Sequence, residues 1–440
     1  MTRSTPALAL AGLLGAAAVA VALAAPGGVL ADAPPQGTAQ GQPQDTPRDP
    51  RGRPDYRFLS SPDFLNMDVA DLTGLRTWDE GLPTGTSPQH EVALDVVLDG
   101  FVVEAPQDVL VSGDLVEGHW GLDDAGTGLF GPVDTERRQQ RAVARAARSY
   151  YPAWLERFRA HGLPLPHTAI GDHELGDNPW MRRSPGYSGF KWQHLGLFRR
   201  LYADALVAPR EYAAHPSSGP ARSTAYATSL DPEVLLVTLD VFSRTGNGVA
   251  AEVDPAQLRW LRDVLGRAGR TGVDWVVVQG HTPVLGPVRQ IGSSGLMYEG
   301  GRSSALWRTL TRHDVDLYLA GEVHDMTAIR DGGVTQISHG GLFGYGGTNY
   351  LVGEVRGDEL SLVSRRFETS WDGAERIWQT DTRMGQPLDL TYQPDPPVVG
   401  RMTVTTDGRV LERGGVLAPY HPGADVADAP RSDPSPGEQD

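Results

Sequence analysis

Short apolar runs alternate with longer amphipathic stretches through most of the chain. Helical periodicity, with apolar residues three or four positions apart, marks residues 91–101, 135–158 and 254–269. The short runs are rich in valine and leucine and too brief for helices, so they predict strands: "DVLVSGD", "PHTAIGD", "VLLVTLD", "WVVVQGH" and "VDLYLAGEVH". Because strands and helices alternate, the pattern predicts a largely parallel sheet covered by helices.

The stretch at 254–269 carries the clearest helix signals. Asp254 is a good N-cap, and Pro255 stands at the first helical position, where its missing N–H costs nothing. Leucines at 258, 261 and 265 form one apolar stripe, and Gly266 lies near the expected end. We therefore expect a surface helix with one buried face.

A different pattern appears near the C-terminus. Two stretches alternate apolar and polar residues on either side of a glycine turn, "YLVGEVRGDELSLVSRRFE" and "RMTVTTDGRVLE". Both are typical of β-hairpins, with turns at Gly357 and Gly408. The whole pattern thus predicts a mixed α/β layer fold with late antiparallel strands.

The two ends of the chain lack this alternation. Residues 1–31 combine Arg3, a long uncharged apolar run and a small-residue "VLA", which predicts a cleaved signal peptide; an uncleaved membrane anchor is the alternative. Residues 32–54 and 422–440 are rich in proline and poor in large apolar side chains, so we expect a disordered linker and tail. The folded domain is then expected at 55–421, secreted or at the cell surface, with no stable membrane span after cleavage.

Composition narrows the function classes. The formal net charge of −16 argues against nucleic-acid binding, which normally requires a clustered basic surface. The chain has no cysteine, which excludes thiolate metal ligands and a lipidated cysteine. Hydrophobic residues at 40% and charged residues at 21% fit an ordinary core-forming protein.

Four of the predicted strands end alike, in a glycine followed by a side chain that can bind metal. These ends are Gly113-Asp114, Gly171-Asp172-His173-Glu174, Gly280-His281 and Gly321-Glu322-Val323-His324. Ligands bind at the carboxyl ends of strands in open α/β sheets, so the four ends could meet at one point. Taken singly, each glycine-aspartate pair also fits a turn, and each histidine a structural role.

The order of these motifs resembles that of the calcineurin-like metallophosphoesterase superfamily, which includes the purple acid phosphatases. "VLVSGDLVEGHW" corresponds to the family's GD motif, "AIGDHELGDNPW" to GNH followed by an acid, "VVVQGHTP" to the isolated GH, and "YLAGEVHD" to GHxH. The resemblance implies an α/β fold with a two-sheet β-sandwich flanked by helices, in four αββα layers. It also implies a two-metal site at the strand ends.

The resemblance assigns a role to each matching residue. Asp114 would bridge both metals, and His324 would bind the first metal. The second metal would be bound by Asp172, His281 and Glu322, while His173 would be the catalytic residue that contacts the phosphate or protonates the leaving oxygen. The first family motif, D-x-H, has no complete match: Asp63, directly after an apparent strand, is the first choice for its ligand, and Asp68 the second.

Two ligands depart from the family pattern. Asp172 stands where the family has asparagine, and Glu322 where it has the first histidine of GHxH. Each change replaces a neutral ligand with an anionic one. This favours Mn²⁺, Mg²⁺ or a ferric ion over an imidazole-type Zn²⁺ site, although the identity of the two divalent or trivalent ions stays open, as does the oligomeric state.

Four polar residues beside the motifs are candidates for substrate binding: His119, Trp180, Arg182 and Arg183. An arginine there could grip a phosphate with two hydrogen bonds, although both arginines also fit an ordinary surface. "SHGGLFGYGG" is similar to the oxyanion loop of lipases, but no G-x-S-x-G elbow accompanies it, which excludes a serine hydrolase.

The sequence therefore predicts an exported, metal-dependent phosphatase or phosphodiesterase. It would hydrolyse small phosphate mono- or diesters through a metal-bound hydroxide. The main alternative is a non-catalytic cell-surface binding protein that keeps the fold with an altered site. A carboxylate-paired glycosidase is a weaker alternative, because no such pair stands on a recognisable scaffold.

Overall fold

The computed structural model describes residues 54–63, 68–80, 82, 85, 88–122, 128–176, 189–246, 248–341, 347–372, 389–392 and 394–422. All of them belong to one unit, Arg53–Asp440. The predicted signal peptide, linker and tail lie outside the described residues, apart from Pro54 and Pro422. No helix among the described residues is long and apolar enough to cross a membrane.

The first β-sheet combines the start and the end of the folded part. Its strands lie in the order β16-β15-β13-β12-β1-β2-β3, with β14 paired to β13. β1, β2 and β3 are parallel, whereas β12 runs antiparallel to β1. The two predicted hairpins are present as β12–β13 and β15–β16. The strands are β1 (Tyr56–Ser60), β2 (Asp108–Val111), β3 (His167–Thr168), β12 (Gly347–Arg356), β13 (Glu359–Asp372), β14 (Asp389–Tyr392), β15 (Val398–Thr405) and β16 (Val410–Gly415).

The second β-sheet has the order β10-β11-β9-β8-β5-β4. Its inner strands β5, β8, β9 and β11 are parallel, and β4 and β10 run antiparallel at the two edges. The prediction of one largely parallel sheet from the alternation of strands and helices is therefore wrong, since the parallel strands divide between two mixed sheets. The strands are β4 (Tyr226–Asp231), β5 (Val234–Thr238), β8 (Trp275–Gln279), β9 (Leu317–Ala320), β10 (Thr327–Asp331) and β11 (Val334–Ser338); β6 (Phe242–Arg244) and β7 (Val249–Ala251) form a separate pair.

Alternating side chains on the strands build two apolar layers. Phe58 and Leu110 of the first sheet share one buried cluster with Leu236, Val277 and Leu319 of the second. Their neighbours on the same strands point the other way and pack with the helices. Because consecutive side chains of a strand face opposite sides, both sheets are apolar on both faces, and the molecule is a sandwich with helices outside.

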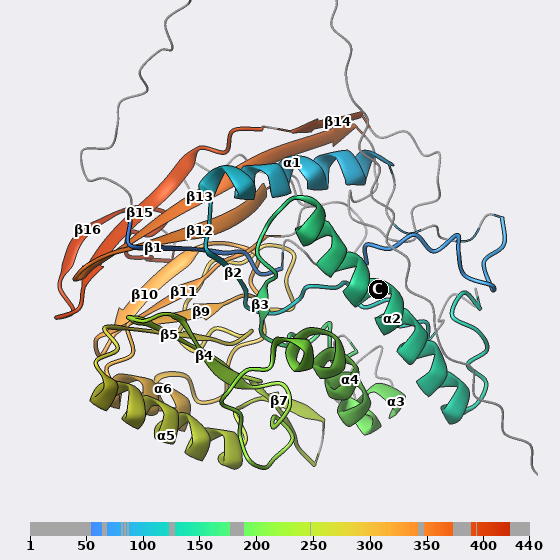
Figure 1. Ribbon diagram of the computed structural model, residues 1–440, viewed down its shortest axis with the longest axis horizontal. Helices are drawn as coiled ribbons and strands as arrows, with labels where there is room; N and C mark the ends of the chain where they lie inside the picture. Colours follow the sequence, from blue (N-terminus) through green and yellow to red (C-terminus); the bar gives the residue numbers. More distant parts are fainter. Residues whose placement is uncertain are drawn as a thin grey trace, which may run out of the picture. The chain divides into compact units, whose positions relative to one another are not determined.

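The helices cover the outer faces of the two sheets. Figure 1 shows α1 beside the strands of the first sheet and α5 with α6 beside those of the second. The helices are α1 (Pro88–Glu104), α2 (Glu136–Ala160), α3 (Gly189–Gln193), α4 (Leu195–Tyr202), α5 (Pro255–Thr271) and α6 (Ala305–Arg312), with single turns at Ala203–Val207, Ala208–Arg210 and Gly301–Ser303. The predicted four-layer αββα arrangement is confirmed.

Helix α5 begins as predicted and ends later than predicted. The Asp254 carboxylate accepts hydrogen bonds from the backbone N–H groups of Ala256 and Gln257 at its start. The helix continues past Gly266 and stops at Gly272, whose φ of 75° is left-handed. The residues after Gly266 bury Ala268 in the core, which outweighs the weak helix propensity of glycine.

Candidate metal centre

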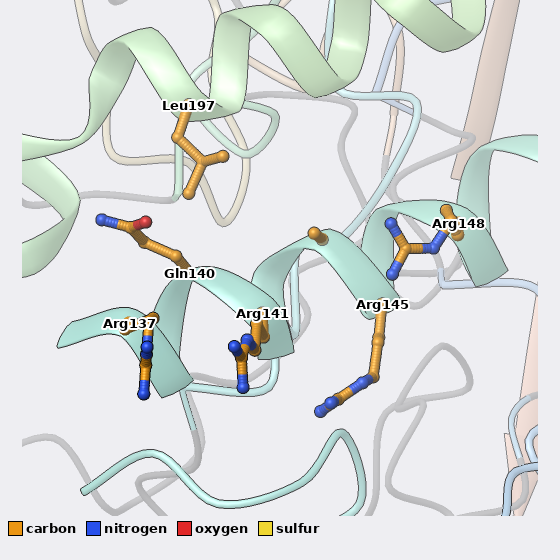
Figure 2. Close-up of a pocket in the computed structure, with 7 residues that line it drawn as sticks. Arg137, Gln140, Arg141, Arg145, Arg148 and Leu197 are labelled. Atoms are coloured by element: carbon orange, nitrogen blue, oxygen red, sulfur yellow. The ribbon is translucent and has the colours of Figure 1, made fainter. Parts of the chain in front are cut away.

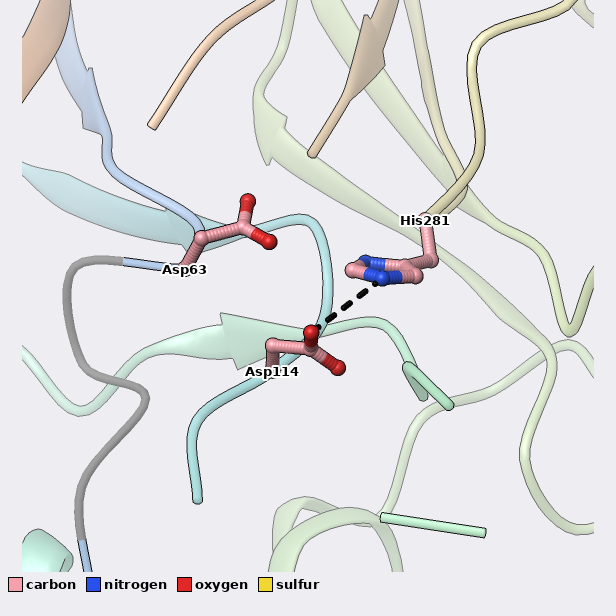
Figure 3. Close-up of side chains that lie close together, drawn as sticks. All are labelled: Asp63, Asp114 and His281. Carbon is pink, nitrogen blue, oxygen red and sulfur yellow. Dashed lines mark ion pairs between the residues drawn. The ribbon is translucent and has the colours of Figure 1, made fainter. Parts of the chain in front are cut away.

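Five strands end at one cluster of carboxylate and imidazole side chains. Asp63, Asp114 and Asp172 follow β1, β2 and β3 of the first sheet, and His281 and Glu322 follow β8 and β9 of the second. Figure 3 shows Asp63, Asp114 and His281 turned toward one another from three different strands. Atoms able to bind a metal lie within 4.8 Å of one another in three overlapping groups: Asp63–Asp114–His281, Asp114–Asp172–His173 and Asp172–His281–Glu322.

His281 is the centre of this cluster. Its Nδ1 lies 3.0 Å from the Ser112 carbonyl oxygen, to which it donates its proton. Its Nε2 lies 2.8 Å from Asp172 Oδ1, 3.3 Å from Asp114 Oδ2 and 3.3 Å from Glu322 Oε2. Burial by itself lowers the pKa of His281, but the three carboxylates raise it well above its usual value. The position thus strongly favours a positive charge, which a metal ion can supply in place of a proton.

Two further histidines are held in the same way. His324 and His173 each direct Nδ1 at a main-chain carbonyl oxygen. Their Nε2 atoms face carboxylates, at 3.6 Å from Asp63 Oδ1 for His324 and 3.9 Å from Asp114 Oδ2 for His173. A ring whose Nδ1–H is fixed by a carbonyl presents its Nε2 lone pair to a metal, which is the usual arrangement of metal-binding histidine.

The glycines that precede the clustered residues leave room for neighbouring motifs. A Cβ atom on Gly171 would lie 2.0 Å from Asp114 Oδ1, and one on Gly321 would lie 2.3 Å from Asp63 Oδ2. No larger residue fits at these distances. Each glycine therefore makes space for the carboxylate of a different strand, so the motifs interlock.

The backbone is strained at four residues of the carboxylate and imidazole cluster. Asp63, Asp114, Glu322 and His324 have φ between 56° and 71°, in the left-handed region that L-residues with side chains rarely adopt. Such conformations cost on the order of 1–3 kcal/mol each and persist where the surrounding structure enforces them. Here they turn each side chain inward at the end of its strand.

The family model of the calcineurin-like phosphoesterases matches residues 87–326 of the 440. The chain belongs to this family. The structure is also similar to a dimetal phosphatase from Danio rerio, with 16% identity and a TM-score of 0.40 over 70% of this chain and 95% of that one. For PhoD the values are 12% and 0.48, over 85% of this chain and 75% of that one. None of the curated proteins compared with the chain matches it.

Glu174 closes the family's third motif and has a role that the sequence did not reveal. Its buried carboxylate accepts hydrogen bonds from the backbone N–H groups of Gly171, Asp114, Leu115 and Val116. Burial and the nearby Asp114 charge raise the pKa of Glu174 to about 7, against the effect of these N–H donors. The side chain thus joins the loops that carry Asp114 and Asp172.

A serine loop holds the carboxylate that replaces the family histidine. Glu322 Oε1 accepts hydrogen bonds from Ser294 Oγ at 2.6 Å, from the Leu296 N–H at 2.9 Å and from Ser293 Oγ at 3.3 Å. Glu322 Oε2 is thereby directed at His281. No pattern in "IGSSGL" indicated this contact.

The alternative first-motif aspartate lies outside the three ligand groups. Asp68 is buried, and its carboxylate accepts hydrogen bonds from the Gly118 and His119 N–H groups and lies 2.9 Å from His119 Nδ1. The structure therefore brings Asp63, and not Asp68, to the ligand cluster. Asp68 instead fixes the loop that follows Asp114.

The substrate-binding candidates are described only in part. The side chain of His119 is half-exposed, and its Nδ1 lies 2.9 Å from Asp68 Oδ2. Its neighbour Trp120 is buried and donates from Nε1 to the His173 carbonyl oxygen at 2.8 Å. Trp180, Arg182 and Arg183 lie outside the described residues.

Proposed function

We propose that this chain is an exported phosphoesterase that uses two metal ions to hydrolyse phosphate mono- or diesters. The observation that carries the proposal is that Asp114 belongs to two of the three groups of ligand atoms at the strand ends. Membership of the calcineurin-like phosphoesterases supports it, and the apolar run near the N-terminus supports export. Two cations around one shared carboxylate polarise a phosphoryl group and activate water for its attack.

The residues present suit such a pair of ions. Asp63 and His324 would hold one ion, and Asp114 would contribute to both. Asp172, His281 and Glu322 would hold the other. Among the described residues, the ion-pair partners of Asp63, Asp114 and Glu322 are histidines alone. Buried carboxylates this close together repel, and divalent cations are the natural means of neutralising them.

His173 would act on the phosphate itself. Its Nδ1 is held by the Glu117 carbonyl oxygen, so Nε2 is the atom that faces the cluster. When protonated, Nε2 donates a hydrogen bond to a phosphate oxygen or delivers a proton to the leaving oxygen. The backbone N–H of His173 donates to Asp114 Oδ1 at 3.3 Å, which would keep the ring beside the bound ions.

The anionic ligands indicate the class of metal. Asp172 and Glu322 supply anionic carboxylate oxygens where the family has a neutral amide and a neutral imidazole, so we expect Mn²⁺, Mg²⁺ or ferric iron to support activity better than Zn²⁺. The metal content of the purified protein, measured by mass spectrometry, tests this preference.

Hydrolysis of an aryl phosphate and of the corresponding bis-aryl phosphate, with Mn²⁺ supplied, tests the function itself. Asp114→Asn should lower kcat/KM by roughly 100-fold or more, because it removes the charge shared by both ions. Asp263→Asn, on the exposed face of α5, makes the same chemical change away from the site and should leave activity unaltered. Wild-type protein that binds metal and hydrolyses neither ester would instead be a binding protein with this fold.

A further inference from the structure

Four arginines form a row along one exposed face of α2. Arg137, Arg141, Arg145 and Arg148 follow one another at intervals of four, four and three residues. At 3.6 residues per turn they fall within an arc of about 80° and extend over roughly 16 Å of helix. All four are exposed, and with Gln140, Ala144 and Leu197 they line an open pocket of ≈ 360 Å³. Figure 2 shows Arg137, Arg141 and Arg145 leaving the same side of α2.

Among the residues described, most of these arginines form no polar contact that stabilises the fold. The opposite face of α2 supplies the core contacts, through apolar residues such as Tyr150 and Trp154. Arg145 donates to the Phe130 carbonyl oxygen. Within the described part of the chain, Arg137, Arg141 and Arg148 form no ion pair.

The acidic residues of α2 are engaged elsewhere. Glu136 lies 2.9 Å from His194 Nε2, and Glu156 lies 3.6 Å from Arg159 NH1. Like charges four residues apart on a helix repel, and nothing on α2 offsets that repulsion along the row. This occurs in a chain whose net charge is −16, so the positive charge is local and concentrated.

A second long surface helix of the same chain, α5, lacks such an unbroken row of arginines. Arg259, Asp263, Arg267 and Arg270 have the same spacing on α5 as the four arginines have on α2. An aspartate there interrupts the positive row at the second position. The two helices thus provide a matched pair, one with an unbroken row and one without.

We propose that the arginine face of α2 binds a linear polyanion whose phosphate groups lie along the helix. Guanidinium groups bind phosphate with two parallel hydrogen bonds, and arginines four residues apart on the helix are separated by about 6 Å, which places them beside alternate phosphates of a linear chain. The length of the row suits a chain of phosphates rather than one ion. None of the residues that line this face belongs to the metal centre, so the proposal does not depend on the chemistry of that centre.

Titration of metal-free protein with short-chain inorganic polyphosphate, followed by calorimetry, tests the proposal. Chelation of the metals keeps the metal centre from binding the probe. The variant R137Q/R141Q/R148Q should bind polyphosphate at least about 10-fold more weakly than wild type. The slope of log affinity against log salt should also become smaller by about 2. Glutamine is as good a helix former as arginine, and the change removes charges that repel one another, so the melting temperature should not fall.

The α5 variant R259Q/R267Q/R270Q is the matched control, since it removes the same number of arginine charges from the exposed face of a helix whose row is interrupted by Asp263. It should bind polyphosphate as wild type does. Equal loss of affinity in both variants would show an effect of net charge and overturn the proposal. So would orthophosphate binding as tightly as polyphosphate, or binding only to phosphatidylglycerol vesicles, which would make the face a membrane contact. Phosphoesterase activity is measured separately, so its failure leaves this test intact.

Discussion

Glu174→Gln is the most informative single change in the centre, because it removes one oxygen and leaves the side-chain shape intact. In the wild type, Oε2 accepts the N–H groups of Gly171 at 2.7 Å and Asp114 at 3.0 Å, while Oε1 accepts those of Leu115 at 2.7 Å and Val116 at 3.2 Å. Glutamine has a single acceptor oxygen. Its NH₂ group must therefore face two N–H donors, whichever way the amide is turned.

The cost follows from those two orphaned donors. Glu174 is fully buried, so water cannot take over the lost hydrogen bonds. A buried unsatisfied N–H costs about 1–3 kcal/mol. Glutamine also removes a charge that burial disfavours, as the raised pKa of Glu174 shows. The net fall in the free energy of unfolding should therefore lie near the lower end of the sum for two donors, about 2 kcal/mol. That is a large share of the total stability of a typical domain, about 5–15 kcal/mol. Because Asp114 and Gly171 move with their N–H groups, activity should fall as well.

Urea denaturation of the metal-free protein measures this loss directly. Glu233→Gln, an exposed site, makes the same chemical change and should shift the unfolding free energy by less than about 0.5 kcal/mol. If Glu174→Gln unfolds at the same urea concentration as the wild type, the carboxylate does not hold the two loops together, and the reasoning is wrong.

Three further predictions concern metal binding, the hydrogen bond that positions Glu322, and the dependence of stability on pH. Metal-free protein should gain stability as Mn²⁺ is added, by about 2.7 kcal/mol at 100 times the dissociation constant, and a melting temperature independent of Mn²⁺ would contradict the centre. Ser294→Ala, which removes the 2.6 Å hydrogen bond to Glu322, should weaken Mn²⁺ binding by roughly 10-fold or more in a calorimetric titration; a change below about twofold would count against that positioning role. Burial raises the pKa of Asp316 to about 7, so this carboxyl group binds a proton more tightly in the folded state than in the unfolded chain. Stability should therefore fall as pH rises from about 4 to about 7. Asp316→Asn keeps an acceptor for the Val276 N–H and should flatten that slope in thermal melts, whereas an unchanged slope would assign the pH dependence to other groups.

The fold was predictable where the signals were local. Asp254 and Pro255 fixed the start of α5, and glycine turns fixed the late hairpins. The division of the strands between two sheets was not in the local pattern, because it depends on partners far apart, such as Tyr56 opposite Val355. Only the family resemblance indicated two sheets.

In the metal centre, too, the residues marked by local signals were predictable and the contacts between distant segments were not. Residues directly after strands, such as Asp114 and His281, could be placed together because the topology brings strand ends to one edge. Glu174 was visible in its motif, but three of its four backbone partners, Asp114, Leu115 and Val116, come from another loop. Ser294 reaches Glu322 from 28 positions away, and no rule of spacing predicts that contact.

The left-handed backbone at the centre has a consequence for protein engineering. Seven non-glycine residues in the described part of the chain have positive φ, and Asp63, Asp114, Glu322 and His324 are among them. Glycine at any of the four would relieve both the backbone strain and, for the acids, the repulsion between buried carboxylates. A selection for heat resistance without metal would therefore enrich variants that have lost their ligands. The same selection in the presence of metal should retain them, because ion binding then outweighs the strain.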